Sequence, residues 1–274
     1  MKKLSLLFLT LSSTFAFCQF VSPGTGVTYN LASLSAAAPT VLVNNGADYQ
    51  MTADITISNG DILLINEDTT LKINAGNLMT IAGTYDTTAN NFVITATNPA
   101  SVWKGMRLES TANVTFKNTT IEYGGGIQAL TGNFVMDNCI VRYNKSGQSS
   151  GAAINFSTGA PVVKNSQFIE NDLPVVASGA NSSVALEFSN NYLSKNNKLN
   201  SNRPQINMGA SGPNATTKII NNTIIGNRTS DKVGGVSVSS LLGIANNVLI
   251  DGNTISDNRY GITITGNNCT GTIS

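Results

Sequence analysis

Histidine is absent from all 274 residues of the chain. Its absence excludes histidine general acids and bases, Ser-His-Asp and Cys-His nucleophiles, and most zinc sites. Charged residues are also scarce, at 11% of the chain against about 25% in an average soluble protein. The formal net charge is only +1, so electrostatics gives no indication that nucleic acid or an anionic membrane is a partner.

Long apolar runs are confined to the N-terminus. Two lysines precede the apolar stretch from Leu4 to Phe17. Ala16 and Cys18 occupy the −3 and −1 positions of a cleavage site, so residues 1–18 are expected to be a signal peptide cleaved before Gln19. Lipidation of Cys18 is a weaker alternative, because the preceding phenylalanine is bulky. No later run reaches the ~18 apolar residues of a membrane span, and we expect a secreted or cell-surface protein.

One short pattern recurs six times in the second half of the chain. Its copies begin at Asn118, Asn138, Asn165, Asn190, Asn221 and Gly252, at intervals of 20, 27, 25, 31 and 31 residues. Two positions before each start the residue is apolar: Phe116, Met136, Val163, Phe188, Ile219 and Ile250. Three positions after it the residue is apolar again: Ile121, Val141, Phe168, Leu193, Ile224 and Ile255. Constant positions at variable intervals indicate a solenoid whose loops differ in length.

A third apolar site follows each copy after a variable loop. These sites are Ile127, Ile154, Val175, Ile206, Val236 and Ile262. Segments such as 236–238 and 262–264 alternate apolar and polar residues, which is typical of half-buried strands, and runs with the helical period are absent. The sequence therefore predicts an all-β protein with several short strands per turn. Cys139 and Cys269 lie several turns apart, beyond disulfide reach if each turn rises by ~4.8 Å, so both are expected to be free.

Asparagine is the characteristic residue of the repeat. Six positions after each start stand Gly124, Asn144, Asn171, Asn196, Asn227 and Asn258. Asparagine tolerates the left-handed backbone conformation that tight turns require, and stacked side-chain amides hydrogen bond in a ladder. These two structural roles explain the repeat asparagines without any ligand.

The repeat and its upstream extension define the expected domains. Short strands are predicted around 61–65, 70–73, 77–81 and 92–95, separated by turn residues. Residues 19–52 lack this rhythm and are expected to form an N-terminal cap and first coil, because an exposed end of a solenoid invites edge pairing. Residues 53–274 are expected to form the solenoid, with a C-terminal end that is open or truncated.

The segment from Gly252 to Ile264 resembles the repeat of right-handed single-stranded parallel β-helix proteins, the pectate-lyase-like superfamily. Residues Trp103 to Leu108, together with the strands between Leu71 and Ile81, resemble the first coils of secreted β-helix proteins that gliding bacteria export through a type IX system. The similarity covers Ala53 to Ser274. It implies a right-handed parallel β-helix, and it does not specify an activity, because the superfamily contains lyases, hydrolases, epimerases and proteins without known catalysis.

A polysaccharide lyase is the catalytic alternative. Lyases of this fold use a lysine or arginine base beside calcium held by acidic side chains. The residues one position before the first three repeat starts are Lys117, Asp137 and Lys164, with Arg142 on a neighbouring strand. Under this alternative Lys117, Lys164 or Arg142 is the base and Asp137 a calcium ligand. A charge ladder on a solvated face explains the same residues, and no other cofactor is indicated.

Tyr123 and Tyr143 occupy the same repeat position on adjacent coils. Stacked on each other, with Glu122, Arg142 and Asn144 beside them, they are candidates for a glycan-binding face. Stacked tyrosines also stabilise β-helices without a ligand. The sequence thus predicts a secreted, non-catalytic surface or adhesin-like module with polysaccharides or cell-surface glycans as partners, and the lyase as the alternative. It makes no prediction of oligomeric state.

Overall fold

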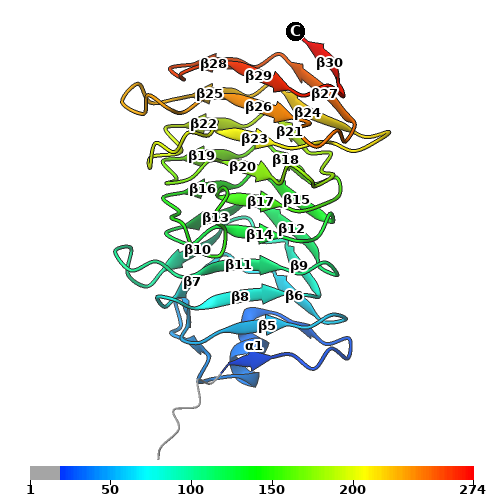
Figure 1. Ribbon diagram of the computed structural model, residues 1–274. Coiled ribbons are helices and arrows are strands. Elements are labelled where there is room, and N and C mark those ends of the chain that lie inside the picture. The colour runs from blue at the N-terminus through cyan, green and yellow to red at the C-terminus, as the bar shows by residue number, and fades with distance from the viewer. Residues whose placement is uncertain (1–18) are drawn as a thin grey trace, which may run out of the picture.

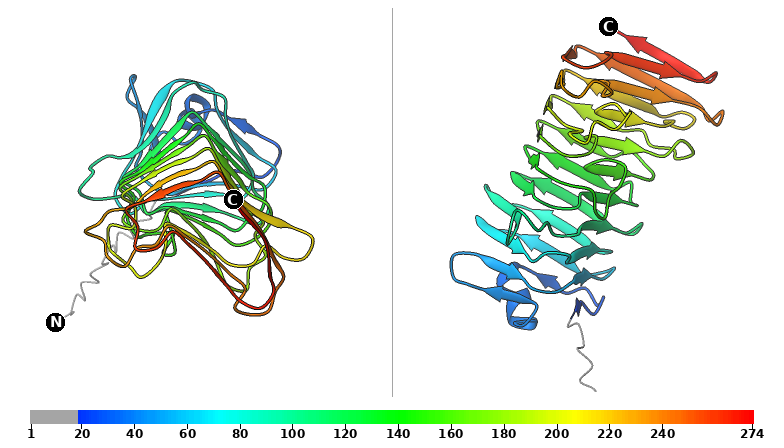
Figure 2. Two further views of the ribbon diagram at one scale, coloured as in Figure 1. Left: turned by 90° about the horizontal axis from the view of Figure 1, so that it is seen from above. Right: turned by 60° about the vertical axis from the view of Figure 1, so that its left-hand side comes forward.

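The computed structural model describes residues 19–274, and the predicted signal peptide lies outside the described residues. The chain forms three sheets of ten strands, which it visits in turn as it rises along a rod (Figure 1). Seen along the rod, successive coils lie over one another (Figure 2). The protein is therefore a single-stranded parallel β-helix, as the repeat predicts. Its coils are crossovers between parallel strands, which are right-handed almost without exception.

The three sheets divide the strands evenly. Sheet A contains β1 (Phe20–Val21), β5 (Ile55–Ile57), β8 (Leu78–Ile81), β11 (Gly105–Leu108), β14 (Ile127–Ala129), β17 (Ile154–Phe156), β20 (Val176–Ser178), β23 (Ile206–Met208), β26 (Val236–Ser239) and β29 (Ile262–Thr265). Sheet B contains β2 (Thr28–Tyr29), β6 (Ile62–Ile65), β9 (Thr84–Thr87), β12 (Asn113–Lys117), β15 (Phe134–Asp137), β18 (Val162–Lys164), β21 (Glu187–Ser189), β24 (Thr216–Ile220), β27 (Asn246–Asp251) and β30 (Cys269–Ile273). Sheet C contains β3 (Leu42–Asn44), β4 (Tyr49–Met51), β7 (Thr69–Ile73), β10 (Phe92–Ala96), β13 (Thr119–Glu122), β16 (Ile140–Arg142), β19 (Gln167–Ile169), β22 (Tyr192–Ser194), β25 (Thr223–Ile225) and β28 (Thr254–Ser256).

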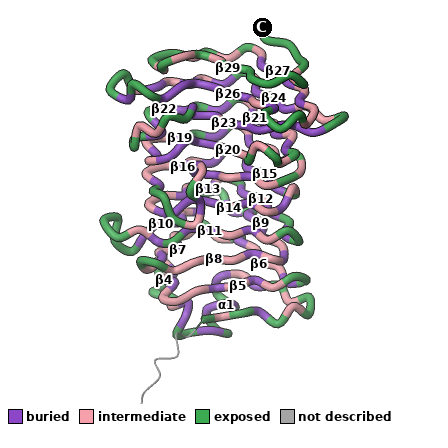
Figure 3. Tube along the Cα trace, in the orientation of Figure 1, coloured by how far each residue is buried: buried purple, intermediate pink, exposed green. Residues whose placement is uncertain are grey.

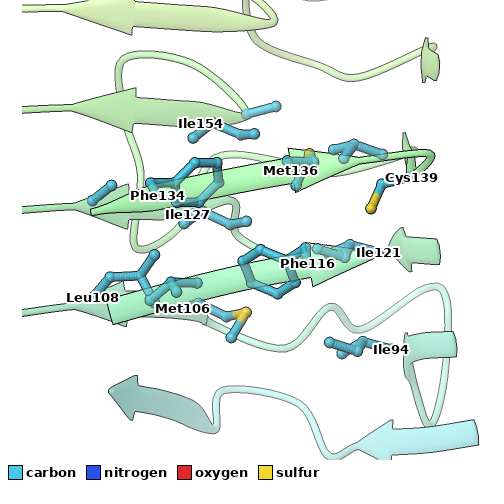
Figure 4. Packing of buried hydrophobic residues seen from close by; sticks show 14 of the residues in the cluster. Ile94, Met106, Leu108, Phe116, Ile121, Ile127, Phe134, Met136, Cys139 and Ile154 are labelled. Carbon is cyan, nitrogen blue, oxygen red and sulfur yellow. The ribbon is translucent and has the colours of Figure 1, made fainter. Parts of the chain in front are cut away.

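The apolar positions of the repeat form continuous columns inside the rod. In sheet C the register places in one column Ile121, Val141, Phe168, Leu193, Ile224 and Ile255. The first five of these are buried, and the tube in Figure 3 alternates between buried and half-buried residues along the strands. Figure 4 shows sheet B residues Phe116, Phe134 and Met136 meeting side chains from the other sheets. Burying each large side chain contributes about 1.5–3 kcal/mol, so the columns are the main source of stability.

The third apolar column differs from its prediction at one coil. Val176, rather than Val175, pairs in register with Ile154 and Ile206. Val175 is also fully buried, but it precedes β20 and its carbonyl accepts a backbone hydrogen bond from Ile154. Because both valines point away from solvent, apolarity alone did not distinguish them.

The N-terminal end of the rod is covered by the helix α1 (Leu31–Ala37). Asn30 caps it, accepting a hydrogen bond from the backbone of Ser33 at 2.8 Å, which satisfies a free amide at the helix start. The buried side chains Leu31 and Leu34 join the apolar interior, and the helix packs against β2, β3 and β6. The strand β3 pairs antiparallel with β4, and all other strand pairs are parallel.

A buried carboxylate attaches the N-terminal segment to the first coils. Asp61 accepts backbone hydrogen bonds from Gly24, Gly26 and Val27 at 2.7, 3.0 and 2.8 Å. Burial opposes its ionisation, but these bonds and one from Ser22 outweigh it and lower the pKa of Asp61 to about 2. The carboxylate therefore acts as a clamp between residues 22–27 and the strand that follows it.

Asparagines of the repeat have separate structural roles. Those at the repeat starts turn the chain from sheet B to sheet C with φ of 48–57°: Asn118, Asn138, Asn165, Asn190 and Asn221. Gly252 takes the same position with φ of 63°. The continuous amide ladders lie one and six positions further on, at buried sites. The predicted ladders are thus confirmed, and the left-handed corners and the ladders use largely different asparagines.

The two ladders satisfy their amides completely. In one, Asn191 Nδ2 donates to Asn222 Oδ1 at 3.1 Å, and Asn222 Nδ2 donates to Asn253 Oδ1 at 2.9 Å. In the other, Asn144 donates to Asn171 at 3.0 Å and Asn171 donates to Asn196 at 2.8 Å. Each ladder amide also bonds to backbone groups of neighbouring coils, so successive coils are joined by side chains as well as by strands.

Both described cysteines are free, as expected. Cys139 packs inward among the apolar columns, and burial raises the pKa of its thiol to about 12. A thiol of this kind is an apolar packing group rather than a nucleophile.

Candidate functional site

The predicted tyrosine pair forms at the corner after sheet C. Tyr123 and Tyr143 follow β13 and β16 with φ of 52° and 55°, and their ring centroids lie 5.3 Å apart at 22°. One face of each ring is therefore covered by the other ring. Arg142 also lies over the Tyr143 ring, 5.5 Å from its centroid. Stacking of a sugar needs an open ring face, and the contact between the two rings leaves each tyrosine at most one.

The other predicted members of this site are engaged by the protein. Arg142 Nε lies 2.7 Å from Glu122 Oε2, and Glu122 Oε1 accepts a hydrogen bond from Thr95 at 3.0 Å. Asn144 is buried within the ladder, where its amide oxygen accepts from the backbone of Gly124 and its nitrogen donates to Asn171. Asn144 is therefore a structural residue that a surface ligand does not reach.

Lys117, Asp137 and Lys164 lie side by side on β12, β15 and β18, as predicted. Lys164 Nζ is 3.4 Å from Asp137 Oδ2, and Asn165 Nδ2 donates to Asp137 Oδ1 at 2.7 Å. Arg142 lies beyond the next corner, at the far end of β16, where it pairs with Glu122. The structure thus places one lysine on either side of Asp137, which pairs with Lys164 alone, and places the arginine elsewhere.

The residues around Asp137 do not fit calcium. Calcium takes six to eight oxygen ligands, commonly from several carboxylates. Asp137 is the one carboxylate of its patch, and both of its oxygens have protein partners. Within residues 19–274 there is no group of three or more acidic, cysteine or histidine side chains arranged to hold a metal. No lyase step through calcium follows from this donor set.

A groove that the sequence did not reveal runs over the corner between sheets B and C. This corner groove has a volume of about 200 Å³ and spans four coils. Its amide-bearing residues are Asn90, Asn91, Asn118, Asn138, Asn165 and Gln167. No Asp, Glu, Lys or Arg lines it. Because two of these asparagines precede the first copy of the repeat, the repeat alone gives no indication of the groove.

A larger hollow of about 440 Å³ lies between two loops that join sheet C to sheet A. It contains charges of both signs, and they are mostly matched to each other. Arg228 Nε lies 2.5 Å from Asp257 Oδ1. A hydrogen bond from Asn200 lowers the pKa of Asp231. The hollow is therefore unlike the uncharged corner groove.

Comparison of the chain with protein-family models, with curated proteins and with solved structures gives no match. Over the described residues, the only helix is the seven-residue α1, and none is long and apolar enough to cross a membrane.

Proposed function

We propose that the chain is a secreted parallel β-helix protein of the pectate-lyase-like superfamily, exported through a type IX system. At the cell surface it acts as a non-catalytic, adhesin-like module that binds polysaccharide or cell-surface glycan along one lateral face. The N-terminal pattern of residues 1–18 supports export. The repeat and the three parallel sheets support the superfamily.

The observation that carries glycan binding is the chemistry of the outer faces. In sheet A the outward column from β5 to β29 is Thr56, Thr80, Arg107, Gln128, Asn155, Ala177, Asn207, Ser237 and Thr263. Seven of these nine residues bear a hydroxyl or an amide at the ~4.8 Å spacing of strands, and only Arg107 and the buried Ala177 interrupt them. Such groups donate and accept hydrogen bonds without charge, which suits a ligand rich in hydroxyls.

Pairing of the candidate bases supports a non-catalytic role. Lys164 is matched by Asp137 and Arg142 by Glu122, whereas Lys117 has no ion pair among the described residues, and the chain has no histidine. The test is incubation of the mature protein with polygalacturonate, alginate and other uronate polysaccharides in calcium, followed by the absorbance of unsaturated products. No product is expected. Product formation by wild type that is lost in Lys117→Ala or Lys164→Ala would establish the lyase instead.

Binding is tested separately by affinity electrophoresis of residues 19–274 in gels that contain neutral or acidic polysaccharides. Retardation by at least one polysaccharide, reversed by the same glycan in solution, is the expected result. If no glycan of the panel retards the protein, the proposal of a glycan-binding module is wrong.

A further inference from the structure

The corner groove has hydrogen-bonding groups that the fold does not use. Among residues 19–274, no residue hydrogen bonds to the side-chain amides of Asn90, Asn91 and Gln167, and all three are exposed. Asn138 Nδ2 donates to Asn118 at 2.8 Å, and no described donor reaches Asn138 Oδ1. The groove thus presents amide donors and acceptors to solvent, in contrast to the completed ladders inside the rod.

Neither structural role of asparagine explains these free amides. Asn118, Asn138 and Asn165 are required by their left-handed corners, but Asn90, Asn91 and Gln167 do not have positive φ. Gln167 stands at an outward strand position whose neighbours are Ile140 and Tyr192. The fixed corner backbone holds this edge of the groove rigid, which lowers the entropic cost of binding.

An exposed aromatic ring continues the line of the groove. Tyr192 on β22 pairs in register with Gln167 on β19. Its relative exposure is 40%, and it is the one aromatic residue among the exposed large apolar side chains of residues 19–274. No aromatic ring of the described chain stacks on it, unlike Tyr123 and Tyr143. Its ring is therefore open to the apolar face of a sugar.

The charge distribution selects the class of glycan. No charged side chain lines the groove. At its rim Asp137 and Lys164 match each other at 3.4 Å, and Lys117 has no ion pair among the described residues. A uronate or sulfate group inside the groove would lose hydration and meet only uncharged amides and hydroxyls, because the lysines lie at the rim alone. A neutral sugar bears only hydroxyls, which the amides bind as both donors and acceptors.

We propose that the corner groove and Tyr192 bind a neutral polysaccharide whose chain lies parallel to the axis of the rod. This inference rests on the proposed function and specifies its face and its ligand class. Successive sugars meet amides from successive coils, and the sugar beyond Gln167 stacks on Tyr192.

The test is affinity electrophoresis with amylopectin, laminarin and galactomannan as neutral probes, and polygalacturonate and alginate as acidic ones. Wild type is expected to bind a neutral probe, with little change between 0.05 and 0.5 M salt because no ion pair forms. Tyr192→Ala and Gln167→Ala are each expected to weaken binding about three- to tenfold, the loss of one stacking or polar contact. Gln167→Glu places a charge in the groove and should weaken binding of neutral probes without removing side-chain volume.

The matched controls are Asn59→Ala, an exposed amide in the loop between β5 and β6, and Tyr143→Phe in the tyrosine pair. Both are expected to bind like wild type, and far-UV circular dichroism checks the fold of every variant. If Tyr192→Ala, Gln167→Ala and Gln167→Glu all bind a neutral polysaccharide as well as wild type, the corner groove is not the binding site, and the proposed function still holds. If the protein binds the acidic polysaccharides more tightly than the neutral ones, the inference of a neutral ligand is wrong. Absence of any binding overturns the proposed function itself.

Discussion

At the scale of single residues, a few buried polar side chains join the coils. Asn222 is 1% exposed, accepts from the backbone and the side chain of Asn191, and donates to Asn253 and to the carbonyl of Phe188. Its removal leaves several buried partners unsatisfied at once. Such losses cost far more than a surface hydrogen bond contributes.

Asn222→Ala is therefore expected to lower the free energy of unfolding by about 3 kcal/mol. The control is Asn207→Ala, whose half-buried side chain has no hydrogen bond to another described residue. Urea unfolding followed by circular dichroism and by the fluorescence of the buried Trp103 measures both variants. Equal midpoints for the two variants would show that the ladder does not stabilise the fold.

Asp61 makes part of the stability depend on pH. Its folded pKa of about 2 is below the usual 3.8, so its contribution is complete above about pH 4 and is lost as pH falls toward 2. Asp61→Asn is expected to lower the melting temperature clearly at pH 6, with the difference from wild type shrinking toward pH 2. Asp86→Asn, a half-buried carboxylate with no hydrogen bond to a described residue, is the control. A difference from wild type that stays constant across this range would contradict the clamp.

At the scale of single strands, alternation assigns each residue to the interior or the surface. In β25 the side chain of Ile224 is fully buried and that of Ile225 is half-buried on the outer face. Ile224→Asp places an unpaired carboxylate inside the rod and is expected to unfold neighbouring coils. Ile225→Asp is expected to remain folded. Far-UV circular dichroism and limited proteolysis separate the two outcomes, and full strand content in Ile224→Asp would contradict the inward assignment.

The columns of strands were predictable because they depend on local periodicity. The loops were not, since intervals of 20 to 31 residues fix neither their path nor their contacts. Gly124 illustrates the limit: it lacks the amide of its column because a Cβ there would lie 2.4 Å from the ring of Trp103. Asn227 likewise takes no part in the ladder. The side chain of Gln205 replaces it, accepting a hydrogen bond from Asn196 and donating one to Asn258. These exchanges depend on residues brought together from different loops.

Candidate sites were less predictable than strands for the same reason. The sequence placed Tyr123 beside Tyr143 and Asp137 beside Lys164, because equal repeat positions lie on adjacent coils. It did not reveal that Asn144 is buried. Burial depends on which face of a corner a side chain occupies, and this is set by the backbone conformation of the corner rather than by repeat position.

At the scale of the whole molecule, the strands of each coil hydrogen bond only to the strands directly above and below, and a few loop contacts, such as Gln205 to Asn258, reach past one coil. Stability is therefore nearly a sum of similar contributions along the rod, and destabilising changes on distant coils are expected to add. The pair Asp61→Asn and Asn222→Ala, at opposite ends, tests this. Their combined loss of unfolding free energy is expected to match the sum of the single losses, measured in urea, and a much larger combined loss would indicate cooperation across the rod.

The same stacking determines how the rod responds to tension. The hydrogen bonds of a parallel β-helix point along its axis, so a pull on its two ends loads them lengthwise and detaches one coil at a time. A released coil of 20–31 residues extends the chain by about 70–110 Å. Stretching between two beads is expected to give a saw-tooth trace with steps of that length. A protein that tethers a cell to a surface would in this way lengthen under load before its bond to the surface breaks.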